Sequence, residues 1–404
     1  MIMSTKKSNT RAAQGSGTIR ERKDGRWEAR YTIGRGTNGK QIQRSVYGSS
    51  EKEVLEKLQR IQVDITDNLY VEPSKLTVGQ WLDIWVDVYT GKIKETTKKQ
   101  YKHYIDKHIK RVLGNIPLQK LDPLKIQRFY NELEKSGRIL QKGQKKEAPA
   151  GLSAKTIRNI HAILHKALKK AVLLKYLKNN PTDKDVCEPP DVEKKEMKIL
   201  QGDEIGVFLN AVESHRYKTL YLIMLFCALR RGEALGISWN DIDFIDKTIL
   251  INRQVQRKDG QLCLVPIKNN KQRRISPPET IFNLLSELRI EQMKKKELAG
   301  AIWSESGLVF TNGIGKPLDG DVIYKAYKKL LKDSGLPDIR IHDLRHTAAT
   351  LMLQNGDSVK TVQNTLGHFS AGFTLDTYGH VTEKMNRDSA DRMEALIQGF
   401  SKTA

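Results

Sequence analysis

The chain has few cysteines and no long apolar run. Its three cysteines, Cys187, Cys227 and Cys263, are scattered through 404 residues, which fits neither a disulfide framework nor the paired spacing of a zinc site. The apolar segment 221–229 is far shorter than the roughly 20 residues that cross a membrane. Residues 1–14 lack the apolar centre of an export signal. We therefore expect a protein of the reducing cytoplasm with no membrane partner.

Acidic side chains are outnumbered by basic ones, and the imbalance is uneven along the chain. The chain holds 70 Lys and Arg against 47 Asp and Glu, a formal net charge of +23. Residues 1–185 carry 39 basic and 19 acidic side chains, and therefore +20 of this charge. A field of this kind attracts a polyanion such as nucleic acid. A lysine-rich surface kept for solubility is the alternative, although solubility would not confine the charge to one half of the chain.

The N-terminal residues predict a basic tail, then a small sheet with one helix. We assign residues 1–15 to a disordered tail and residues 16–68 to a domain with three strands and a helix. Asp24-Gly25 and Asn38-Gly39 favour tight turns between the strands, because glycine tolerates positive φ. Ser49-Ser50-Glu51-Lys52-Glu53 is typical of a capped helix start.

Alternation along the strands predicts one apolar and one basic face of this sheet. The apolar side chains at every second position are Trp27, Ala29, Tyr31 and Ile33. The arginines expected on a face that enters a DNA groove are Arg20, Arg22, Arg30 and Arg44. A solvated basic sheet without a ligand is the alternative interpretation.

An all-α, strongly basic domain is predicted for residues 77–182, after a linker at 69–76. Thr96-Thr97, Asp122-Pro123 and Ser153 are suited to begin three of its four helices. Helical spacing places three aromatic residues in the core rather than on a base-stacking surface: Trp81, Trp85 and Tyr104. The last helix carries further DNA-binding candidates: Lys155, Arg158, Lys166 and Lys169.

The second half of the chain predicts a different architecture. Residues 183–198 form a second linker, residues 199–385 a mixed α/β, mainly helical domain, and residues 386–404 a tail helix. The strands of this domain are expected near 247–251, 262–266 and 274–278. The whole chain is therefore predicted to be multidomain, with an α+β, an all-α and a mixed α/β part.

Cations, histidines and one tyrosine recur close together near the C-terminus. His342-Asp343-Leu344-Arg345-His346 is followed by Leu366-Gly367-His368 and Tyr378-Gly379-His380, and Arg230-Arg231 lies further upstream. Two guanidiniums can bind the oxygens of a phosphodiester and offset the charge of its transition state. A tyrosine, with an ordinary pKa of about 10, would attack the phosphate with help from a neutral histidine. Each motif alone is typical of an ordinary helix surface, but together they favour phosphoryl transfer.

Four segments resemble, in order and separation, the hallmark boxes of tyrosine recombinases. They are residues 229–235, 342–347, 366–368 and 377–381. The whole chain resembles the three-domain integrases of phages and conjugative transposons. The resemblance implies an arm-type DNA-binding domain at 16–68, a core-binding, SAM-like domain at 77–182 and a catalytic domain at 199–385.

The resemblance also assigns catalytic roles. The matching positions are Arg230, Lys268, His342, Arg345, His368 and Tyr378, with Glu233 as a supporting residue. Tyr378 would be the nucleophile, and Arg230 and Arg345 would hold the scissile phosphate. His342 would act as the general base and His368 as a hydrogen-bond donor.

One catalytic position has an alternative nearby, and one segment differs from the family pattern. Lys268, expected in a β-hairpin, would protonate the 5′-oxygen leaving group, with Lys271 as the alternative. The family usually has Thr-Gly where this chain has Cys227-Ala228, which predicts a slightly different backbone path without loss of activity.

The implied function is site-specific DNA recombination that integrates and excises a mobile element through a 3′-phosphotyrosyl intermediate and a Holliday junction. Four copies would assemble on core-type and arm-type attachment sites of double-stranded DNA, with an accessory directionality factor, in a bacterial cytoplasm and at its nucleoid. The phosphotyrosyl bond conserves energy, so no cofactor or catalytic metal is expected. A tail stripe of Met393, Leu396, Ile397 and Phe400 would dock on a neighbouring copy or on its own domain.

Two other functions share parts of this pattern. A type IB topoisomerase has the same nucleophile and clamp but would not need the small domain at 16–68. A catalytically idle DNA-binding regulator would not need Tyr378, Arg230 and Arg345 together.

Overall fold

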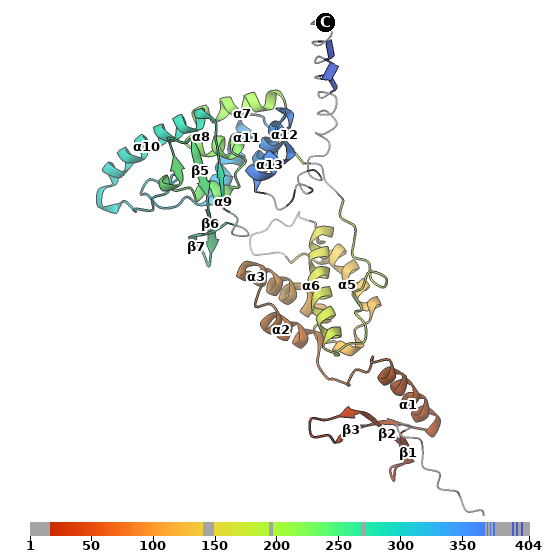
Figure 1. Cartoon of the computed structure of the whole chain (residues 1–404). Coiled ribbons are helices and arrows are strands. Elements are labelled where there is room, and N and C mark those ends of the chain that lie inside the picture. Colours follow the sequence, from red (N-terminus) through yellow and green to blue (C-terminus); the bar gives the residue numbers. More distant parts are fainter. Residues whose placement is uncertain are drawn as a thin grey trace, which may run out of the picture. The chain divides into compact units, whose positions relative to one another are not determined.

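The computed structural model divides into two compact units, Met1–Lys194 and Lys195–Ala404 (Figure 1). It describes residues 17–139, 149–193, 197–267 and 272–367, and positions 370, 372, 375, 390, 391, 393, 394, 397 and 398. The boundary between the units falls within the segment predicted as the second linker. Among the helices of these described residues, none is long and apolar enough to span a membrane.

The first unit begins with a three-stranded antiparallel sheet and one helix (Figure 1). In chain order and in sheet order the strands are β1 (Thr18–Glu21), β2 (Trp27–Arg35) and β3 (Gln41–Gly48), followed by α1 (Glu51–Thr66). Ser50 accepts a hydrogen bond from the Glu53 N–H at 3.3 Å, which confirms the predicted helix start. Ala29 and Tyr31 are buried with Val54 of α1, so the predicted apolar face is confirmed.

The prediction that Arg44 shares a face with the other three arginines is wrong. Arg44 is the cross-strand partner of Tyr31, whose side chain is buried on the face that α1 covers. Its Nε donates to Glu72 Oε1 at 2.7 Å. Strand alternation already groups Arg44 with Ile42 and Val46, because every second residue points to the same side. Charge is therefore a poorer guide than strand position here.

Helices form the rest of the first unit. They are α2 (Val78–Tyr89), α3 (Glu95–Tyr104), the π-helix η1 (Ile105–Ile109), α4 (Lys110–Leu113), the 3-10 turn η2 (Leu118–Lys120), α5 (Pro123–Ser136) and α6 (Ala154–Leu173). Asp122 and Ser153 cap α5 and α6 as predicted. The predicted cap at Thr96-Thr97 is wrong, because α3 begins at Glu95, whose charge suits the positive end of the helix dipole. Trp81 is 1% exposed and donates from Nε1 to Ala167 O, which confirms its place in the core.

The chain after α6 remains packed against the helices of the first unit, unlike a free linker. Cys187 is buried in the helical core. The Gln127 side chain exchanges hydrogen bonds with the backbone of Glu188, at 3.0 and 3.1 Å. Arg158 donates to Pro190 O at 2.8 Å and pairs with Asp191. The first part of the segment predicted as a linker therefore packs along α5 and α6.

The second unit is mixed α/β and mainly helical, as predicted. Its helices are α7 (Asp203–Glu213), α8 (Lys218–Phe226), α9 (Arg231–Leu235), α10 (Glu279–Ala299), α11 (Gly320–Asp333), α12 (Asp343–Gln354) and α13 (Val359–Leu366), with 3-10 turns η3 (Trp239–Asp241) and η5 (Gly300–Ile302). Its strands are β4 (Ile242–Asp243), β5 (Thr248–Ile251), β6 (Arg253–Lys258), β7 (Gln261–Pro266) and β8 (Arg273–Ile275). One antiparallel sheet has the order β4-β5-β8, and β6 and β7 form a separate hairpin.

The strand β6 is absent from the sequence prediction for a physical reason. Its residues are mostly polar, and only Val255 is buried, so it lacks an apolar run. Pairing with β7 over its whole length holds it in place. The nearly all-buried helix α8 forms the centre of this unit's core, next to α9, α10 and α12.

Candidate active site

Arg230 and Glu233 lie at the start of α9, directly after the buried helix α8. The Glu233 carboxylate accepts the Arg230 backbone N–H at 3.1 Å and its guanidinium Nη1 at 2.7 Å. The Arg230 side chain is 31% exposed, whereas that of Glu233 is 2% exposed. Glu233 therefore fixes the Arg230 guanidinium from its buried side, and part of the guanidinium remains exposed to solvent.

Arg273 on β8 is a second cation at the same carboxylate, and the sequence motifs did not include it. Its Nη2 donates to Glu233 Oε2 at 2.7 Å, and its Nε donates to Thr365 O at 2.9 Å. The Arg273 side chain is 10% exposed. Strand alternation with the buried Ile275 is the signal that points to an inward Arg273. Arg273 thus joins the support of Arg230 to the C-terminal end of α13.

The charge of Glu233 is fixed by these two arginines. Burial alone would raise the pKa of Glu233, but the hydrogen bonds and charges of Arg273 and Arg230 outweigh it and lower the pKa to about 2. The carboxylate therefore stays ionised at any pH near neutrality. It can orient two guanidiniums without competing for a proton.

Arg345, in the first turn of α12, connects two other segments of the site. Its Nη1 donates to Ala228 O at 2.6 Å, and its Nη2 donates to Leu366 O. The side chain is 1% exposed. The helix α12 packs against both α8 and α13, and its Arg345 guanidinium binds the carbonyl of Ala228, which follows α8, and that of Leu366, the last residue of α13.

The start of α12 is fixed by Asp343 and Arg340. Asp343 is 2% exposed and accepts the Arg340 backbone N–H at 2.7 Å. The Arg340 guanidinium donates to the same carboxylate, with Nη2 to Oδ1 at 2.7 Å. Asp343, which lies between His342 and Arg345 in the sequence, therefore fixes the start of α12.

His342 is kept neutral by its surroundings. It stands at the N-cap of α12 with helical backbone angles, so the predicted one-turn relation to Arg345 holds. Desolvation, followed by the charges of His346, Arg345 and Arg230, lowers the pKa of His342 to about 4. A neutral imidazole can accept a proton from a tyrosine.

The lowered pKa gives a direct test by nuclear magnetic resonance. In the DNA-free protein, the ring of His342 is expected to take up its proton only as the pH falls towards about 4, well below the ordinary histidine value. Carbon-13 labelled histidine signals followed from pH 8 to pH 4 provide the measurement, and His342→Asn identifies the signal. A midpoint near the ordinary value would contradict the description of this ring.

Ala228 occupies a backbone conformation that favours glycine. Its φ is 53°, and its methyl group is fully buried among residues of α12 and α13. A left-handed residue with a Cβ costs about 1–2 kcal/mol. Ala228 therefore carries conformational strain at the residue whose carbonyl binds Arg345, and the difference in backbone path from the family stays a prediction.

Ala228→Gly is expected to change the free energy of unfolding by less than about 1 kcal/mol. Relief of the strain is offset by the lost methyl burial, about 0.8 kcal/mol, and by the extra freedom of glycine in the unfolded chain. Urea denaturation measures the balance. Ala228→Val is the contrasting variant, because a branched Cβ at positive φ should destabilise strongly. A large loss in the glycine variant would show that the methyl contributes more than its area.

Three predicted catalytic residues, Lys268, His368 and Tyr378, lie outside the described residues, as does Lys271. Their roles remain predictions. The described residues close to them in the sequence include Arg273, which follows the two lysines. Gly367, with a φ of 62°, ends α13 immediately before His368.

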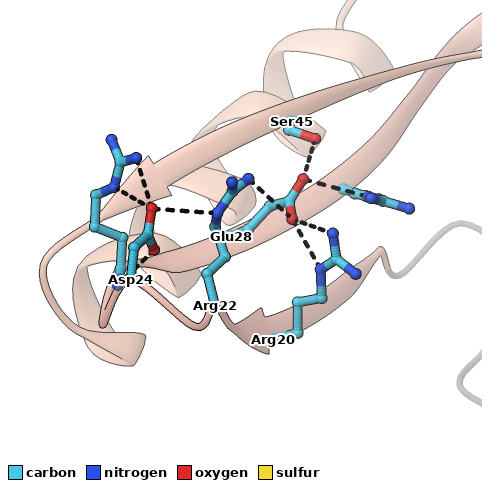
Figure 2. Close-up of polar contacts among 7 residues, drawn as sticks. Arg20, Arg22, Asp24, Glu28 and Ser45 are labelled. Atoms are coloured by element: carbon cyan, nitrogen blue, oxygen red, sulfur yellow. Dashed lines mark hydrogen bonds and ion pairs between the residues drawn. The ribbon is translucent and has the colours of Figure 1, made fainter.

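The DNA-binding candidates of the first unit lie on two surfaces. On α6, all four basic candidates are exposed: Lys155, Arg158, Lys166 and Lys169. Arg158 is also paired with Asp191, and Lys166 donates to the Tyr101 hydroxyl at 3.3 Å. On the sheet, Arg20 and Arg22 are directed towards Glu28 (Figure 2). Arg30 pairs with the same carboxylate.

The described part of the site can bind and polarise an anion. Arg345 donates to Ala228 O at 2.6 Å, two residues before Arg230, so guanidiniums from two separate boxes lie close together beside His342, which is three residues before Arg345. Preorganised donors of this kind stabilise the charge that develops in phosphoryl transfer.

Comparisons with known proteins identify the family to which this chain is similar. The model of the phage integrase family matches residues 198–385, and the model of the phage integrase N-terminal SAM-like domain matches residues 77–134. A tyrosine recombinase XerC-like protein of Caldanaerobacter subterraneus subsp. tengcongensis is 30% identical over 385 residues, covering 91% of this chain and 95% of that protein. The ICEBs1 integrase of Bacillus subtilis is 27% identical, with 89% and 94% covered.

Solved structures show the same fold. The Tn1549 transposon integrase in complex with a circular intermediate DNA aligns with a TM-score of 0.65 and 21% identity, over 79% of this chain and 99% of that one. A lambda integrase tetramer bound to a Holliday junction aligns with a TM-score of 0.54 and 19% identity, over 89% and 95%.

The chain belongs to the phage integrase family and is a tyrosine recombinase. Within that class it is a site-specific DNA recombinase of the integrase type, which inserts a mobile element into DNA.

Proposed function

We propose that recombination by this chain proceeds through Tyr378. The tyrosine oxygen attacks the scissile phosphorus, a 3′-phosphotyrosyl bond forms, and the bond to the 5′-oxygen breaks. His342 takes the tyrosine proton, and Lys268 gives a proton to the leaving oxygen. A 5′-hydroxyl from another strand then reverses the step, and the exchange passes through a Holliday junction.

One observation supports this assignment most strongly. Arg230 comes from one stretch of sequence, and His342 and Arg345 come from another. Arg345 donates to Ala228 O, two residues before Arg230, and Arg230 is held by the buried Glu233, which Arg273 also pairs with. The arginines offset the extra negative charge, and the neutral His342 matches a general base. His368 would add a hydrogen bond to the phosphate.

The proposal extends to partners and assembly. By analogy with the lambda integrase tetramer on a Holliday junction, four copies would act together on two duplexes. Residues 16–68 would bind arm-type sites and residues 77–182 core-type sites, with a directionality factor as accessory partner, on the nucleoid of a bacterial cytoplasm. In the tail, Met393 and Ile397 are 58% and 55% exposed, which suits docking on a neighbouring copy.

Strand exchange tests the function against its alternatives. Two duplexes that carry the attachment sites, one of them labelled, are incubated with the full chain and with Tyr378→Phe. The wild type is expected to give recombinant products and junction intermediates, and the variant neither. Relaxation of supercoils without exchange would favour a topoisomerase. Binding without any covalent step in the wild type would favour a regulator.

A further inference from the structure

A buried carboxylate lies at the centre of the basic face of the N-terminal sheet. Glu28, in the middle strand β2, is the cross-strand partner of Arg20, and its side chain is 3% exposed. Figure 2 shows the carboxylate with Arg20, Arg22 and Ser45 directed towards it. Carboxylates are almost never buried to this degree unless they are paired. The arginines therefore cover Glu28 on the side of the sheet opposite α1.

Each oxygen of Glu28 has its own partners. Oε2 accepts a hydrogen bond from Arg20 Nε at 2.8 Å and lies 3.8 Å from Arg22 Nη1. Oε1 accepts from Ser45 Oγ at 2.8 Å and from Arg30 Nε at 3.3 Å. The side chains of Arg20, Arg22 and Arg30 nevertheless remain 55%, 38% and 47% exposed. Glu28 thus contacts three arginines that still face solvent, and the Arg22 Nε also lies 3.6 Å from Asp24 Oδ2.

Glu28 weakens the electrostatic attraction between this face of the sheet and DNA. Glu28 reduces the charge of this group from +3 to +2, which weakens binding to any polyanion. Hydrogen bonds from Ser45 and Arg20 lower the pKa of Glu28 to about 2, so the negative charge is present at neutral pH. In return, the three arginines are ordered before DNA binds. They therefore lose less conformational freedom on binding.

We propose that Glu28 is a positioning residue for DNA recognition, which holds Arg20, Arg22 and Arg30 in the arrangement that distinguishes the arm-type site from other duplex DNA. The proposal rests on the DNA-binding function proposed for residues 16–68. A guanidinium has five N–H donors, and the edge that meets Glu28 uses only some of them. The others can meet phosphates or the edge of a guanine. Glu28 therefore raises specificity and lowers general affinity.

The site is first defined with the full chain. Sequences bound from a random duplex library are selected with the wild type and with Arg20→Ala, and sequences enriched only by the wild type define the site of the sheet. Dissociation constants for this site and for a scrambled duplex are then measured over a range of salt concentrations.

Glu28→Gln is expected to bind the scrambled duplex more tightly at low salt, with a salt slope steeper by about 0.9. The ratio of specific to scrambled affinity is expected to fall by about tenfold. Glu21→Gln is the matched control, because it makes the same charge change on the neighbouring strand β1, on the side of the sheet away from Arg20. Its ratio should stay at the wild-type value.

Ser45→Ala tests the positioning without a change of charge. It removes the hydroxyl that anchors Oε1, so the ratio should fall while affinity for the scrambled duplex stays constant. Wild-type ratios in both Glu28→Gln and Ser45→Ala would overturn the role of Glu28 while leaving DNA binding by the sheet intact. A library without any Arg20-dependent sequence would overturn both.

Discussion

Replacing Arg273 by Ala is expected to lower the free energy of unfolding of the second unit by about 3–5 kcal/mol. The variant leaves the buried Glu233 with one cation instead of two and removes the hydrogen bond to Thr365 O. A buried charge that loses one of its partners is destabilised because water cannot replace the lost hydrogen bonds. Urea denaturation at neutral pH is the measurement.

Arg274→Ala is the control for this experiment. Arg274 is the next residue of β8, but it is exposed and bonds only at the surface, with Nη1 donating to Thr248 Oγ1 at 3.0 Å. Its loss should change the unfolding free energy by about 0.5 kcal/mol or less. Equal effects of the two substitutions would contradict a special role for Arg273.

The loss of stability at acid pH provides a second test of the pair formed by Glu233 and Arg273. The pKa of Glu233 is about 2 in the folded chain, below the ordinary value for glutamate. Its ionised form therefore stabilises the fold at pH above about 4.3 and loses this contribution as the pH falls towards 2, on the order of 3 kcal/mol in total. Glu233→Gln should be less stable at neutral pH and should lose less of its stability over that acid range.

Replacing Arg345 by Lys is expected to slow DNA cleavage by about 10²–10³-fold or more. A lysine ammonium is a compact point charge. The planar Arg345 guanidinium donates to Ala228 O and Leu366 O at once, and its fixed geometry also suits a phosphate. Single-turnover cleavage of bound DNA isolates this step, and the dissociation constant should change much less than the rate.

Arg340→Lys is the comparison for Arg345→Lys. Arg340 lies in the same segment and pairs with Asp343, but its side chain is 66% exposed. A lysine can keep this ion pair, so cleavage should stay near the wild-type rate. A loss of activity similar to that of Arg345→Lys would mean that the segment as a whole, and not the Arg345 guanidinium, controls the rate.

Local chemistry explains which parts of the fold could be predicted. The caps Ser50, Asp122 and Ser153 begin their helices as predicted because a cap depends on residues within one turn. The apolar face of the sheet follows from alternation. Arg44 could have been placed by the same rule, since it alternates with Ile42 and Val46, but its charge suggested the wrong face.

Contacts between distant residues explain what could not be predicted. Glu28 belongs to the polar side of its strand, and its burial arises only because arginines from the neighbouring strand and its own strand close over it. Arg273 becomes part of the site because β8 brings it to Glu233 and to the end of α13. The family boxes gave Arg230, Glu233, His342 and Arg345, whereas Arg273 and the carbonyl groups that bind Arg345 required the folded chain.

The most direct test of the central claim is the chemical identity of the covalent intermediate. A nicked duplex that carries the attachment site traps the cleaved state, because the short 5′ fragment diffuses away before religation. The full chain is expected to become attached to the 3′-phosphate, with mass spectrometry of the digested adduct placing the phosphate on Tyr378. Tyr378→Phe should give no adduct. An adduct that persists in this variant, maps to another residue, or links to a 5′-phosphate would contradict the account.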